Sequence, residues 1–358
     1  MVTRTLSDLG GWPSVLRPLL AGEHLTASQA GAALTEVLEG AATPAQTAAF
    51  IVALRCKGET VEEMTGLVEA MVAAAVQVRL PPGIEPVDTC GTGGAPSRRD
   101  HALNVSTMAA LVIAGAGVAV CKHGGRAASA TSSSADLLEA LGVAIDLGAG
   151  GVARCVVEVG MGFCFAPRFH AAMRHAGPVR RELGVPTVFN FLGPLANPAG
   201  VKRQVVGVSD PAMAVPMVGV LAGKGAERAM VVAGHDGLDE LTTTTTSTVV
   251  ELRNGDVRTY EVDPLDVGLV RADRAALAGG DPAANMAIVG DLLAGRRGPH
   301  RDIVVLNAAA GLLVGGLVDD LADGVEAAQL AIDDGRATIV LERLVATSQS
   351  AATWAANR

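Results

Sequence analysis

The sequence predicts an α/β protein in which a small N-terminal helical domain precedes a larger domain with a mostly parallel central sheet and C-terminal helices. Residues 1–80 carry helix signals only, whereas β-favouring runs alternate with helical segments from Val87 onward. Hydrophobic residues make up 49% of the chain but aromatic residues only 3%. A core rich in Ala, Val, Leu and Gly is typical of helices packed on such a sheet, and 358 residues suffice for two domains.

Helix capping signals recur three times in the first 80 residues. A Thr three residues before Gln or Glu predicts a capping box, and a Thr before Pro predicts an N-cap followed by a first-turn proline. The pairs are Thr26 with Gln29, Thr43 with Pro44, and Thr60 with Glu63. We expect helices that end near Glu39, Gly58 and Val78. Their apolar faces are buried either against the same subunit or in a dimer interface, and the residues alone favour neither.

The rest of the chain is expected to alternate strands and helices. The expected strands are Val87–Cys90, Val118–Cys121, Gly162–Phe165, Arg203–Val208, Arg228–Ala233 and Thr248–Leu252, with a hairpin turn at Asn254-Gly255. The expected helices are Met108–Ala116, Ala135–Leu141, Val152–Val159, about Met213–Ala222, Gly279 to Leu293, Asp302–Leu313 and Ala337–Ser348. Crossover helices predict parallel strands, and parallel strands bind ligands at their carboxyl ends.

Charge and cysteine usage exclude several classes of protein. The net charge of −9 argues against a general binder of nucleic acid or membrane surfaces. Between Arg98 and Arg203, however, 11 Lys and Arg face 6 Asp and Glu, which suits either a polyanionic small ligand or an exposed helix face. The five cysteines form no CxxC pair, so we expect reduced, buried thiols. Without a leader or an apolar run long enough to span a bilayer, the protein is expected to be soluble and cytoplasmic.

Residues 87–142 carry the glycines, cations and hydroxyl groups of a phosphate site. The first strand stops at Gly91-Thr92-Gly93-Gly94, where glycines let backbone N–H groups approach a ligand. Asn104-Val105-Ser106-Thr107 opens a helix whose first N–H groups and dipole favour an anion. The second strand leads into Lys122-His123-Gly124-Gly125-Arg126, and hydroxyl groups follow from Ser129 to Ser134. These features predict a phosphate site at the carboxyl ends of two strands.

A pair of adjacent carboxylates follows the strand Arg228–Ala233. Asp239 and Glu240 lie on a loop after the carboxyl end of that strand. Oxygen ligands in such a place suit a hard cation. A solvated acidic turn is the alternative explanation.

The segments GTGG, NVST, KHGGR and SADLLEALG follow one another in this order within residues 91–142. Their order resembles the anthranilate phosphoribosyltransferase family, whose motifs read GTGGD, N(I/V/L)ST, KHGNR, a Ser-rich loop and G(S/A)D-LEALG. The resemblance covers nearly the whole chain. It implies the fold of the nucleoside phosphorylase and phosphoribosyltransferase type, and transfer of phosphoribosyl from phosphoribosyl pyrophosphate to the amine of anthranilate, releasing pyrophosphate, in tryptophan biosynthesis.

The resemblance also implies a domain organisation. The helical domain would span residues 1–80 and be completed by about 168–198. The residues Pro81-Pro82-Gly83 themselves indicate a hinge or linker after residue 80. Residues 84–167 and 199–358 would form the α/β domain that binds the phosphoribosyl donor. Family members generally dimerise through the helical domain, so a homodimer is expected. The implied partners are phosphoribosyl pyrophosphate and an aromatic amine, with Mg²⁺ as the cofactor.

The donor and metal sites are expected at the motif positions. Backbone N–H groups and cationic or hydroxyl side chains would bind the phosphates, and neither a covalent nucleophile nor a general base is needed. The donor-binding residues would be Gly91, Thr92, Gly93, Gly94, Asn104, Val105, Ser106, Thr107, Lys122, Gly124, Arg126 and Ser129. In the family the DE pair holds magnesium, which implies Mg²⁺ on Asp239 and Glu240 with Ser106 nearby.

The acceptor site is expected to combine the first motifs with the segment 165–198. The family pattern of FAP, two residues and His is matched by Phe165-Ala166-Pro167 with His170, and its PVR by Pro178-Val179-Arg180. The acceptor-binding residues would be Gly91, His123, Gly125, His170 and Arg180. Arg180 is the expected partner of the acceptor carboxylate because a guanidinium can hold a carboxylate through two hydrogen bonds. An exposed helical face is the alternative for both His170 and Arg180.

Several positions depart from the family motifs. Ala95 replaces Asp after GTGG, residues 97–101 lengthen the following loop, and Gly125 replaces the Asn of KHGNR. Ala130 stands where the family has Ser, and Ser133 where it has Gly. Three interpretations remain: an anthranilate enzyme in which Arg98, Arg99 or Asp100 compensates for Ala95, a paralogue with another acceptor, and a non-catalytic ligand-binding or regulatory protein.

Overall fold

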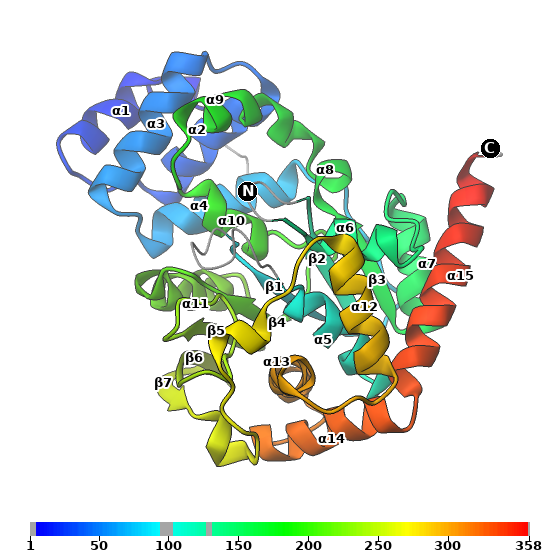
Figure 1. The fold of residues 1–358 in the computed structure, drawn as a ribbon. Helices are drawn as coiled ribbons and strands as arrows, with labels where there is room; N and C mark the ends of the chain where they lie inside the picture. The colour runs from blue at the N-terminus through cyan, green and yellow to red at the C-terminus, as the bar shows by residue number, and fades with distance from the viewer. Residues whose placement is uncertain (1–4, 94–102, 127–130, 357–358) are drawn as a thin grey trace.

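The computed structural model of the protein describes residues 5–93, 103–126 and 131–356, which contain a seven-stranded sheet (Figure 1). Its strand order is β3-β2-β1-β4-β5-β6-β7. The strands are β1 (Val87–Gly91), β2 (Val120–Gly124), β3 (Met161–Phe165), β4 (Arg203–Gly207), β5 (Arg228–Gly234), β6 (Ser247–Arg253) and β7 (Asp256–Val262). The first five strands run parallel, and β6 and β7 add an antiparallel hairpin at one edge. The predicted mostly parallel sheet is therefore confirmed.

The direction of winding changes between β1 and β4. Helix α5 (Val105–Gly115) connects β1 to β2, and its residues belong to the hydrophobic core on one face of the sheet. Helix α11 (Ala214–Gly223) connects β4 to β5 and belongs to the core on the other face. A crevice forms where strand order reverses in this way, at the carboxyl ends of the two central strands. This is the place at which ligands bind in open α/β sheets.

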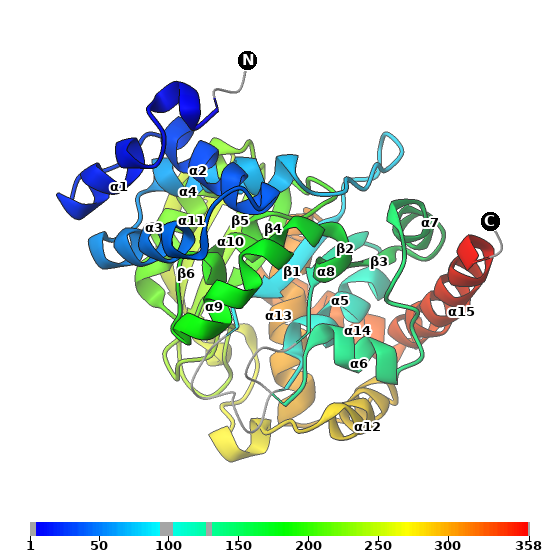
Figure 2. The same cartoon turned by 90° about the horizontal axis from the view of Figure 1, so that it is seen from above.

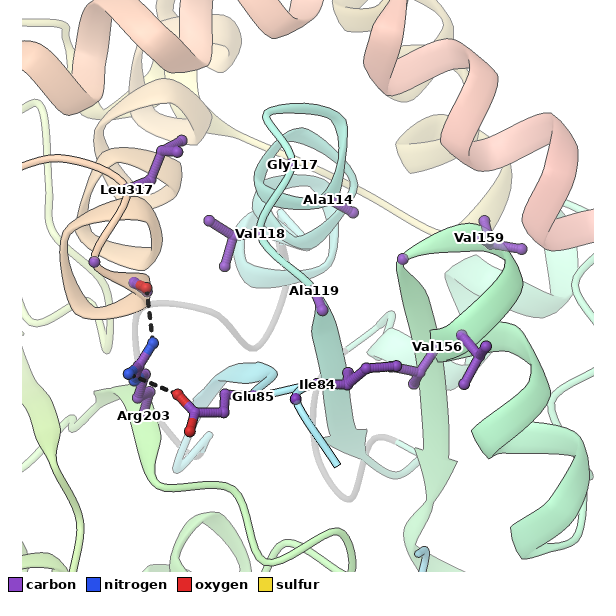
Figure 3. A pocket seen from close by; sticks show the side chains of 15 residues that line it. Ile84, Glu85, Ala114, Gly117, Val118, Ala119, Val156, Val159, Arg203 and Leu317 are labelled. Carbon is purple, nitrogen blue, oxygen red and sulfur yellow. Dashed lines mark hydrogen bonds and ion pairs between the residues drawn. The ribbon is translucent and has the colours of Figure 1, made fainter. Parts of the chain in front are cut away.

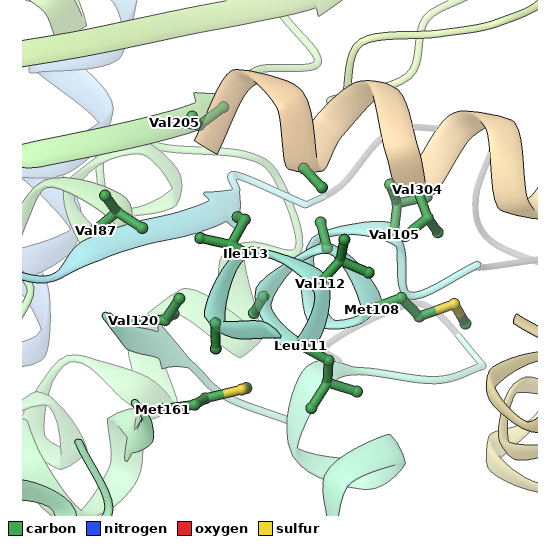
Figure 4. Packing of buried hydrophobic residues seen from close by; sticks show 14 of the residues in the cluster. Val87, Val105, Met108, Leu111, Val112, Ile113, Val120, Met161, Val205 and Val304 are labelled. Atoms are coloured by element: carbon green, nitrogen blue, oxygen red, sulfur yellow. The ribbon is translucent and has the colours of Figure 1, made fainter. Parts of the chain in front are cut away.

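Side chains alternate between two hydrophobic cores along each strand. In β4, for example, Val205 packs into the first core and Val206 into the second. Figure 4 shows Ile113 of α5 among Val87 of β1 and Val120 of β2 in the first core. The first core is covered by α5, α7 (Ala149–Val159), α13 (Pro299–Gly315), α14 (Leu321–Asp333) and α15 (Arg336–Ala356). Alanine and glycine on these helices allow close packing on the strands.

The N-terminal helices cover the second core together with a later segment of the chain. They are α1 (Pro13–Leu20), α2 (Ala27–Glu39), α3 (Pro44–Lys57) and α4 (Val61–Ala73), preceded by the 3-10 turn Ser7–Leu9. All three predicted caps are present as capping boxes, at Thr26, Thr43 and Thr60. Helices α9 (Gly177–Leu183) and α10 (Phe189–Leu195) return between β3 and β4 and pack on α3 and α4. Helix α1 lacks a capping side chain, and the sequence alone did not predict it.

The remaining helices connect the elements already described. They are α6 (Ser134–Ala140), α8 (Ala166–Phe169) and α12 (Pro282–Leu293), with 3-10 turns at Ala171–His175, Pro211–Met213, Pro264–Val267 and Arg274–Leu277. Two views of the molecule show α1–α4 together at one side and α15 at the other (Figures 1 and 2). None of the helices within the described residues has the length and apolarity needed to cross a membrane.

Two local expectations need correction. Strand β2 begins at Val120 and continues to Gly124, so Lys122 and His123 lie within the strand instead of the turn after it. The cause is tertiary, because β2 pairs with β3 along its whole length, from Val120 to Gly124. The cysteines are free thiols, as expected, but Cys56 is exposed while the other four are buried.

A buried ion pair joins α3 and α4 in the N-terminal helices. Lys57 Nζ lies 2.8 Å from Glu63 Oε2, and the two side chains are 4% and 0% exposed. The Glu63 carboxylate also accepts hydrogen bonds from the N–H groups of Leu25 and Thr60, each at 2.8 Å. Burial acts to raise the pKa of Glu63, but these hydrogen bonds and Lys57 outweigh it and hold the pKa below 4.5. Glu63, the third helical residue of the Thr60 capping box, therefore also holds the Leu25 backbone through a buried hydrogen bond.

Glu63→Gln is expected to lower the free energy of unfolding at pH 7 by about 3 kcal/mol, because it leaves Lys57 buried without its counter-charge. Since the folded-state pKa of Glu63 is depressed, this stabilisation is present above pH 4.5 and is lost as the pH falls through the folded-state value. Urea unfolding at pH 7 and at pH 3.5 measures both effects. The exposed Glu39→Gln is the control, with a change within about 0.5 kcal/mol. A difference between Glu63→Gln and the unmodified protein that does not shrink on acidification would contradict the assignment.

Candidate functional site at the carboxyl ends of the strands

The loop after β5 packs directly against the ends of β1 and β4. Gly91 and Gly207 are partners in the register of these two strands. A Cβ atom on Gly91 would lie 2.2 Å from Asp239 Oδ2, and one on Gly207 would lie 1.7 Å from the Asp239 carbonyl oxygen. Position 207 therefore requires glycine, and a side chain at position 91 would displace the Asp239 carboxylate. The fold thus brings Asp239 against the glycine-rich turn, although the two are far apart in the sequence.

The glycine-rich turn is held by hydrogen bonds to two segments, the loop after β5 and the carboxyl end of β4. Gly93 N–H donates to Asp239 Oδ2 at 2.9 Å, and Thr92 N–H donates to the Gly207 carbonyl at 2.8 Å. The Ser209 hydroxyl donates to the Gly93 carbonyl at 3.3 Å. Gly93 has a φ of +66°, in the left-handed region that favours glycine. Gly94, Ala95 and the Arg98–Asp100 segment lie outside the described residues.

The N-terminus of α5 points uncapped backbone groups toward the same region. Asn104 is the N-cap residue, but its side chain makes no capping hydrogen bond, because Asn104 Oδ1 instead accepts from Ser132 Oγ at 2.8 Å. The N–H groups of Val105 and Ser106 precede any intrahelical acceptor and are suited to bind an anion. Thr107 Oγ1 donates to Ser134 Oγ at 2.9 Å, which ties α5 to the hydroxyl-rich loop.

Lys122 is a buried cation in the middle of β2. Its ammonium group donates to the Thr89 carbonyl oxygen and, at 3.1 Å, to Ser106 Oγ. The side chain is 1% exposed. Asp88 lies beneath it on β1, where burial raises the carboxyl pKa and the charge of Lys122 opposes that rise. Lys122 therefore joins the two predicted phosphate segments, β1 and the α5 N-terminus.

Arg126 is paired with carboxylates of α6. Its guanidinium forms ion pairs with Asp136 at 2.8 Å and Glu139 at 3.0 Å on α6, and it lies 5.6 Å from the centre of the Phe165 ring. The side chain is half exposed. Ser133 caps α6 through Asp136, which gives a physical role to the serine that replaces the family's glycine. Ser129 and Ala130 lie outside the described residues.

Two histidines predicted for the acceptor site face each other. The ring centroids of His123 and His170 are 5.0 Å apart, and His123 Nδ1 lies 3.2 Å from the Gly193 carbonyl oxygen. Burial lowers the pKa of His123 to about 3, with a further contribution from His170, and burial also lowers the pKa of His170. Both imidazoles are therefore neutral at neutral pH. Neutral rings can offer a hydrogen-bond donor or acceptor, or an apolar face, to an aromatic ligand.

Arg180 lies on α9, where its guanidinium contacts an aromatic ring. Its guanidinium is 5.3 Å from the centre of the Phe189 ring. Burial lowers the pKa of Arg180, and no ion pair of this residue is found within the described part of the chain. A partly desolvated guanidinium held by an aromatic ring is prepared to bind a planar carboxylate.

The residues around Asp239 fit a hard cation whose ligands come partly from the protein and partly from a substrate. Asp239 and Glu240 are 0% and 4% exposed, and their oxygen atoms, with the Ser106 hydroxyl, are the type of ligand that Mg²⁺ prefers. Among the described residues, however, no group of three or more His, Cys, Asp or Glu surrounds one point. A cation here would therefore complete its shell with water and phosphate oxygens, as Mg²⁺ does in nucleotide and phosphate sites.

Three polar residues that support the site were not predicted from the sequence. Asp88 accepts from His123 N–H at 3.1 Å and from Asn197 Nδ2 at 2.8 Å, which fixes the end of β2. Asn307 on α13 pairs with the main chain of Leu241, one residue after Glu240. The sequence signal for Asp88 was an acidic residue within a β-favouring run, and that for Asn307 was an asparagine within an apolar helix.

An open cavity of about 620 Å³ lies at the amino ends of the strands, opposite the candidate site (Figure 3). It is lined by Ile84 and Glu85, which precede β1, and by Arg203 at the start of β4. Figure 3 shows Arg203 bound to Glu85, an ion pair of 2.7 Å. Arg203 also donates to the Gly315 carbonyl at 3.0 Å. Its cation is thus already neutralised. The amino ends of parallel strands are not where α/β sheets bind ligands, so this cavity is distinct from the candidate site.

The fold and the paired phosphate and carboxylate loops define a glycosyl transferase with a helical bundle and an α/β domain. The corresponding family models, "Glycosyl transferase family, helical bundle domain" and "Glycosyl transferase family, a/b domain", match residues 13–75 and 84–338. An anthranilate phosphoribosyltransferase from Nocardioides sp. is 52% identical over 342 residues, which cover 94% of this chain and 98% of the relative. The chain belongs to the anthranilate phosphoribosyltransferase family.

Solved structures agree with this assignment. Anthranilate phosphoribosyltransferase from Thermus thermophilus superposes with a TM-score of 0.87 at 42% identity, covering 94% of this chain and 99% of that chain. The Saccharomyces cerevisiae enzyme in complex with PRPP and Mg superposes with a TM-score of 0.85 at 27% identity, covering 95% and 98%. The yeast enzyme has also been solved in complex with 4-fluoroanthranilate.

Proposed function

We propose that the protein transfers the phosphoribosyl group of phosphoribosyl pyrophosphate to the amine of anthranilate, as an enzyme of tryptophan biosynthesis. The observation that carries this function is the contact between the glycine-rich turn and the carboxylate loop, in which Gly93 N–H donates to Asp239 Oδ2 at 2.9 Å. It joins a phosphate-binding turn to a candidate Mg²⁺ site at the carboxyl ends of β1 and β4. The family relatives named above carry the same activity.

The reaction requires positioning and charge neutralisation rather than a covalent nucleophile. The bond between C1 of the ribose and pyrophosphate breaks, the amine nitrogen bonds to C1, and the nitrogen releases a proton. Backbone N–H groups of Gly91–Gly94 and Asn104–Thr107, with Lys122, would bind the phosphates of the donor. When bound at Asp239 and Glu240, Mg²⁺ would offset the charge of the departing pyrophosphate. Holding both substrates in line supplies much of the rate acceleration.

The acceptor would be bound by groups on β2 and on the segment that returns to the helical domain. Arg180 would bind the carboxylate of anthranilate, and its position over Phe189 would orient the guanidinium. The neutral rings of His123 and His170 would contact the aromatic ring or the amine. Arg126 would have to leave Asp136 and Glu139 to reach the donor, so its part in binding requires a rearrangement on α6.

The protein is further proposed to be a cytoplasmic homodimer that associates through its N-terminal helices. Leu20 at the end of α1 is 80% exposed and Val52 on α3 is 37% exposed, and such apolar groups suit an interface between helices. The proposed helical domain combines residues 1–80 with about 168–198, since α9 and α10 pack on α3 and α4. Sedimentation equilibrium of the full chain tests the dimer, and a Leu20→Glu, Val52→Glu variant should shift it to monomer.

The activity is tested by the loss of anthranilate fluorescence with phosphoribosyl pyrophosphate, Mg²⁺ and excess protein. A loss that requires both the donor and the metal is expected. If fluorescence persists, calorimetry with phosphoribosyl pyrophosphate decides between the remaining interpretations. Mg²⁺-dependent binding without turnover would identify another acceptor, for which Gly125 and Ala95 are the sequence argument. Absence of binding would identify a non-catalytic member of the family.

Restoring asparagine at position 125 is expected to lower the KM for anthranilate about fivefold. Gly125 is not in the left-handed region, and a Cβ there would meet the nearest atom, Ala166 Cβ, at 3.6 Å, which is ordinary contact. The added amide supplies one hydrogen bond, worth about 1 kcal/mol. Gly124→Asn is the matched control, because its Cβ would lie 3.1 Å from the Phe163 ring and should impair the protein. Steady-state kinetics checks both variants, and an unchanged or raised KM in Gly125→Asn would contradict the prediction.

A further inference from the structure

The loop that carries Asp239 and Glu240 is anchored from below by one asparagine. Asn307 lies in the middle of α13 and is 1% exposed, and every residue of this helix from Ile303 to Val314 is buried. It is the polar position in a stretch that otherwise consists of Ile, Val, Leu, Ala and Gly. A primary amide in such surroundings is destabilising unless its hydrogen bonds are made.

The Asn307 amide is fully occupied by backbone groups. Its Oδ1 accepts from Leu241 N–H at 3.0 Å, and its Nδ2 donates to the Leu241 carbonyl at 2.8 Å. The second Nδ2 hydrogen reaches the Ile303 carbonyl, at 2.8 Å, one turn earlier on α13. The first two bonds fix both the position and the rotation of the Leu241 backbone. The third fixes the rotamer of the asparagine itself.

The opposite side of the same loop is held by the glycine-rich turn. Asp239 Oδ2 accepts from Gly93 N–H at 2.9 Å, and Leu241 follows two residues later. Asp239 and Glu240 therefore lie between an anchor in the turn after β1 and an anchor on α13. Helix α13 also packs on α5, and Figure 4 shows its Val304 beside Val105 at the start of α5. One helix thus contacts both the carboxylate loop and the proposed phosphate-binding helix.

We propose that Asn307 is a positioning residue for Mg²⁺. By holding the Leu241 backbone, it fixes where the carboxylates of Asp239 and Glu240 lie relative to the metal and the pyrophosphate. The proposal rests on the proposed function, because it assigns the metal to these carboxylates. Residues that hold metal ligands from behind commonly change metal affinity by about 10-fold or more when they are replaced. Asn307 bonds to the Leu241 and Ile303 backbones and would therefore act on the two carboxylates through Leu241.

The test is calorimetry of pyrophosphate binding at increasing Mg²⁺ concentration, with the full-length protein. Asn307→Leu keeps the volume and removes the amide, while Asn307→Ala removes the amide with a different packing defect. Both are expected to raise the half-saturating Mg²⁺ concentration about tenfold. Ser348→Ala is the matched control: Ser348 is a buried hydroxyl on α15 that holds the Ala144 N–H at 3.0 Å, far from this loop. It should lower thermal stability and leave the Mg²⁺ dependence unchanged.

The outcomes separate this proposal from the function on which it rests. If the unmodified protein binds pyrophosphate without any dependence on Mg²⁺, the metal assignment fails and the role of Asn307 fails with it. If the unmodified protein shows the dependence and a folded Asn307 variant retains the same half-saturating Mg²⁺ concentration, only the positioning role is overturned. A shift in either folded variant, absent in Ser348→Ala, supports it.

Discussion

Asp239→Asn is expected to lower kcat/KM by about 10²–10³-fold at Mg²⁺ concentrations that saturate the unmodified enzyme. The asparagine has nearly the same shape, and its Oδ1 can still accept from Gly93 N–H, so the loop should keep its place. What is lost is the negative charge of a side chain that is 0% exposed. A hard cation depends on that charge more than on the hydrogen-bonding geometry.

The measurement is initial rate against Mg²⁺ concentration, with Asp236→Asn as a control on the same loop. Asp236 accepts from the hydroxyl groups of Thr242 and Thr244, each at 2.7 Å, and so shapes the loop through protein contacts. Its replacement should have a smaller effect on rate and no effect on the Mg²⁺ dependence. An Asp239→Asn enzyme with the Mg²⁺ dependence of the unmodified protein would place the metal elsewhere.

Lys122→Met is expected to weaken the binding of phosphoribosyl pyrophosphate by at least about 100-fold. Removing one partner of a buried charged contact costs about 3 kcal/mol or more, which corresponds to this change in affinity. Lys122 is 1% exposed, and its ammonium joins Thr89 on β1 to Ser106 at the start of α5. Methionine keeps most of the volume and removes the charge, so the fold should survive.

Calorimetry with phosphoribosyl pyrophosphate and Mg²⁺ checks this expectation. Lys202→Met is the control, because Lys202 is 65% exposed and its ion pair with Glu227, at 3.6 Å, lies at the amino end of β4. Its donor affinity should equal that of the unmodified protein. Near-normal affinity in Lys122→Met would remove Lys122 from the donor site and leave it a structural link between β1 and α5.

Two of the positions that depart from the family motifs can be interpreted from their local structure. Ser133 is explained locally, as the cap of α6. Gly125 is accommodated without steric demand, since an asparagine would fit there. The backbone at position 125 therefore does not require glycine, and what the glycine changes is the missing side-chain amide. Kinetics of Gly125→Asn therefore reports on acceptor recognition directly.

The sequence by itself determined the elements whose cause is local. Each capping box at Thr26, Thr43 and Thr60 depends on contacts across three residues, and the alternation of strand and helix depends on side-chain periodicity. The order of the motifs was sufficient to indicate the family. These features survive any change in tertiary arrangement, because their partners lie within one helical turn or one strand.

The tertiary structure alone decided which distant groups meet. Gly93 and Asp239 are 146 positions apart and are joined because β1 and β5 both flank β4. Pairing with β3 extended β2 through Lys122 and His123. The Arg126 guanidinium forms ion pairs with Asp136 and Glu139 on α6, which the sequence alone did not indicate. Asn307 can bond to the Leu241 backbone because α13 packs against the loop after β5. No local pattern encodes such contacts, since they depend on strand order and on the burial of polar groups that must find partners wherever the fold supplies them.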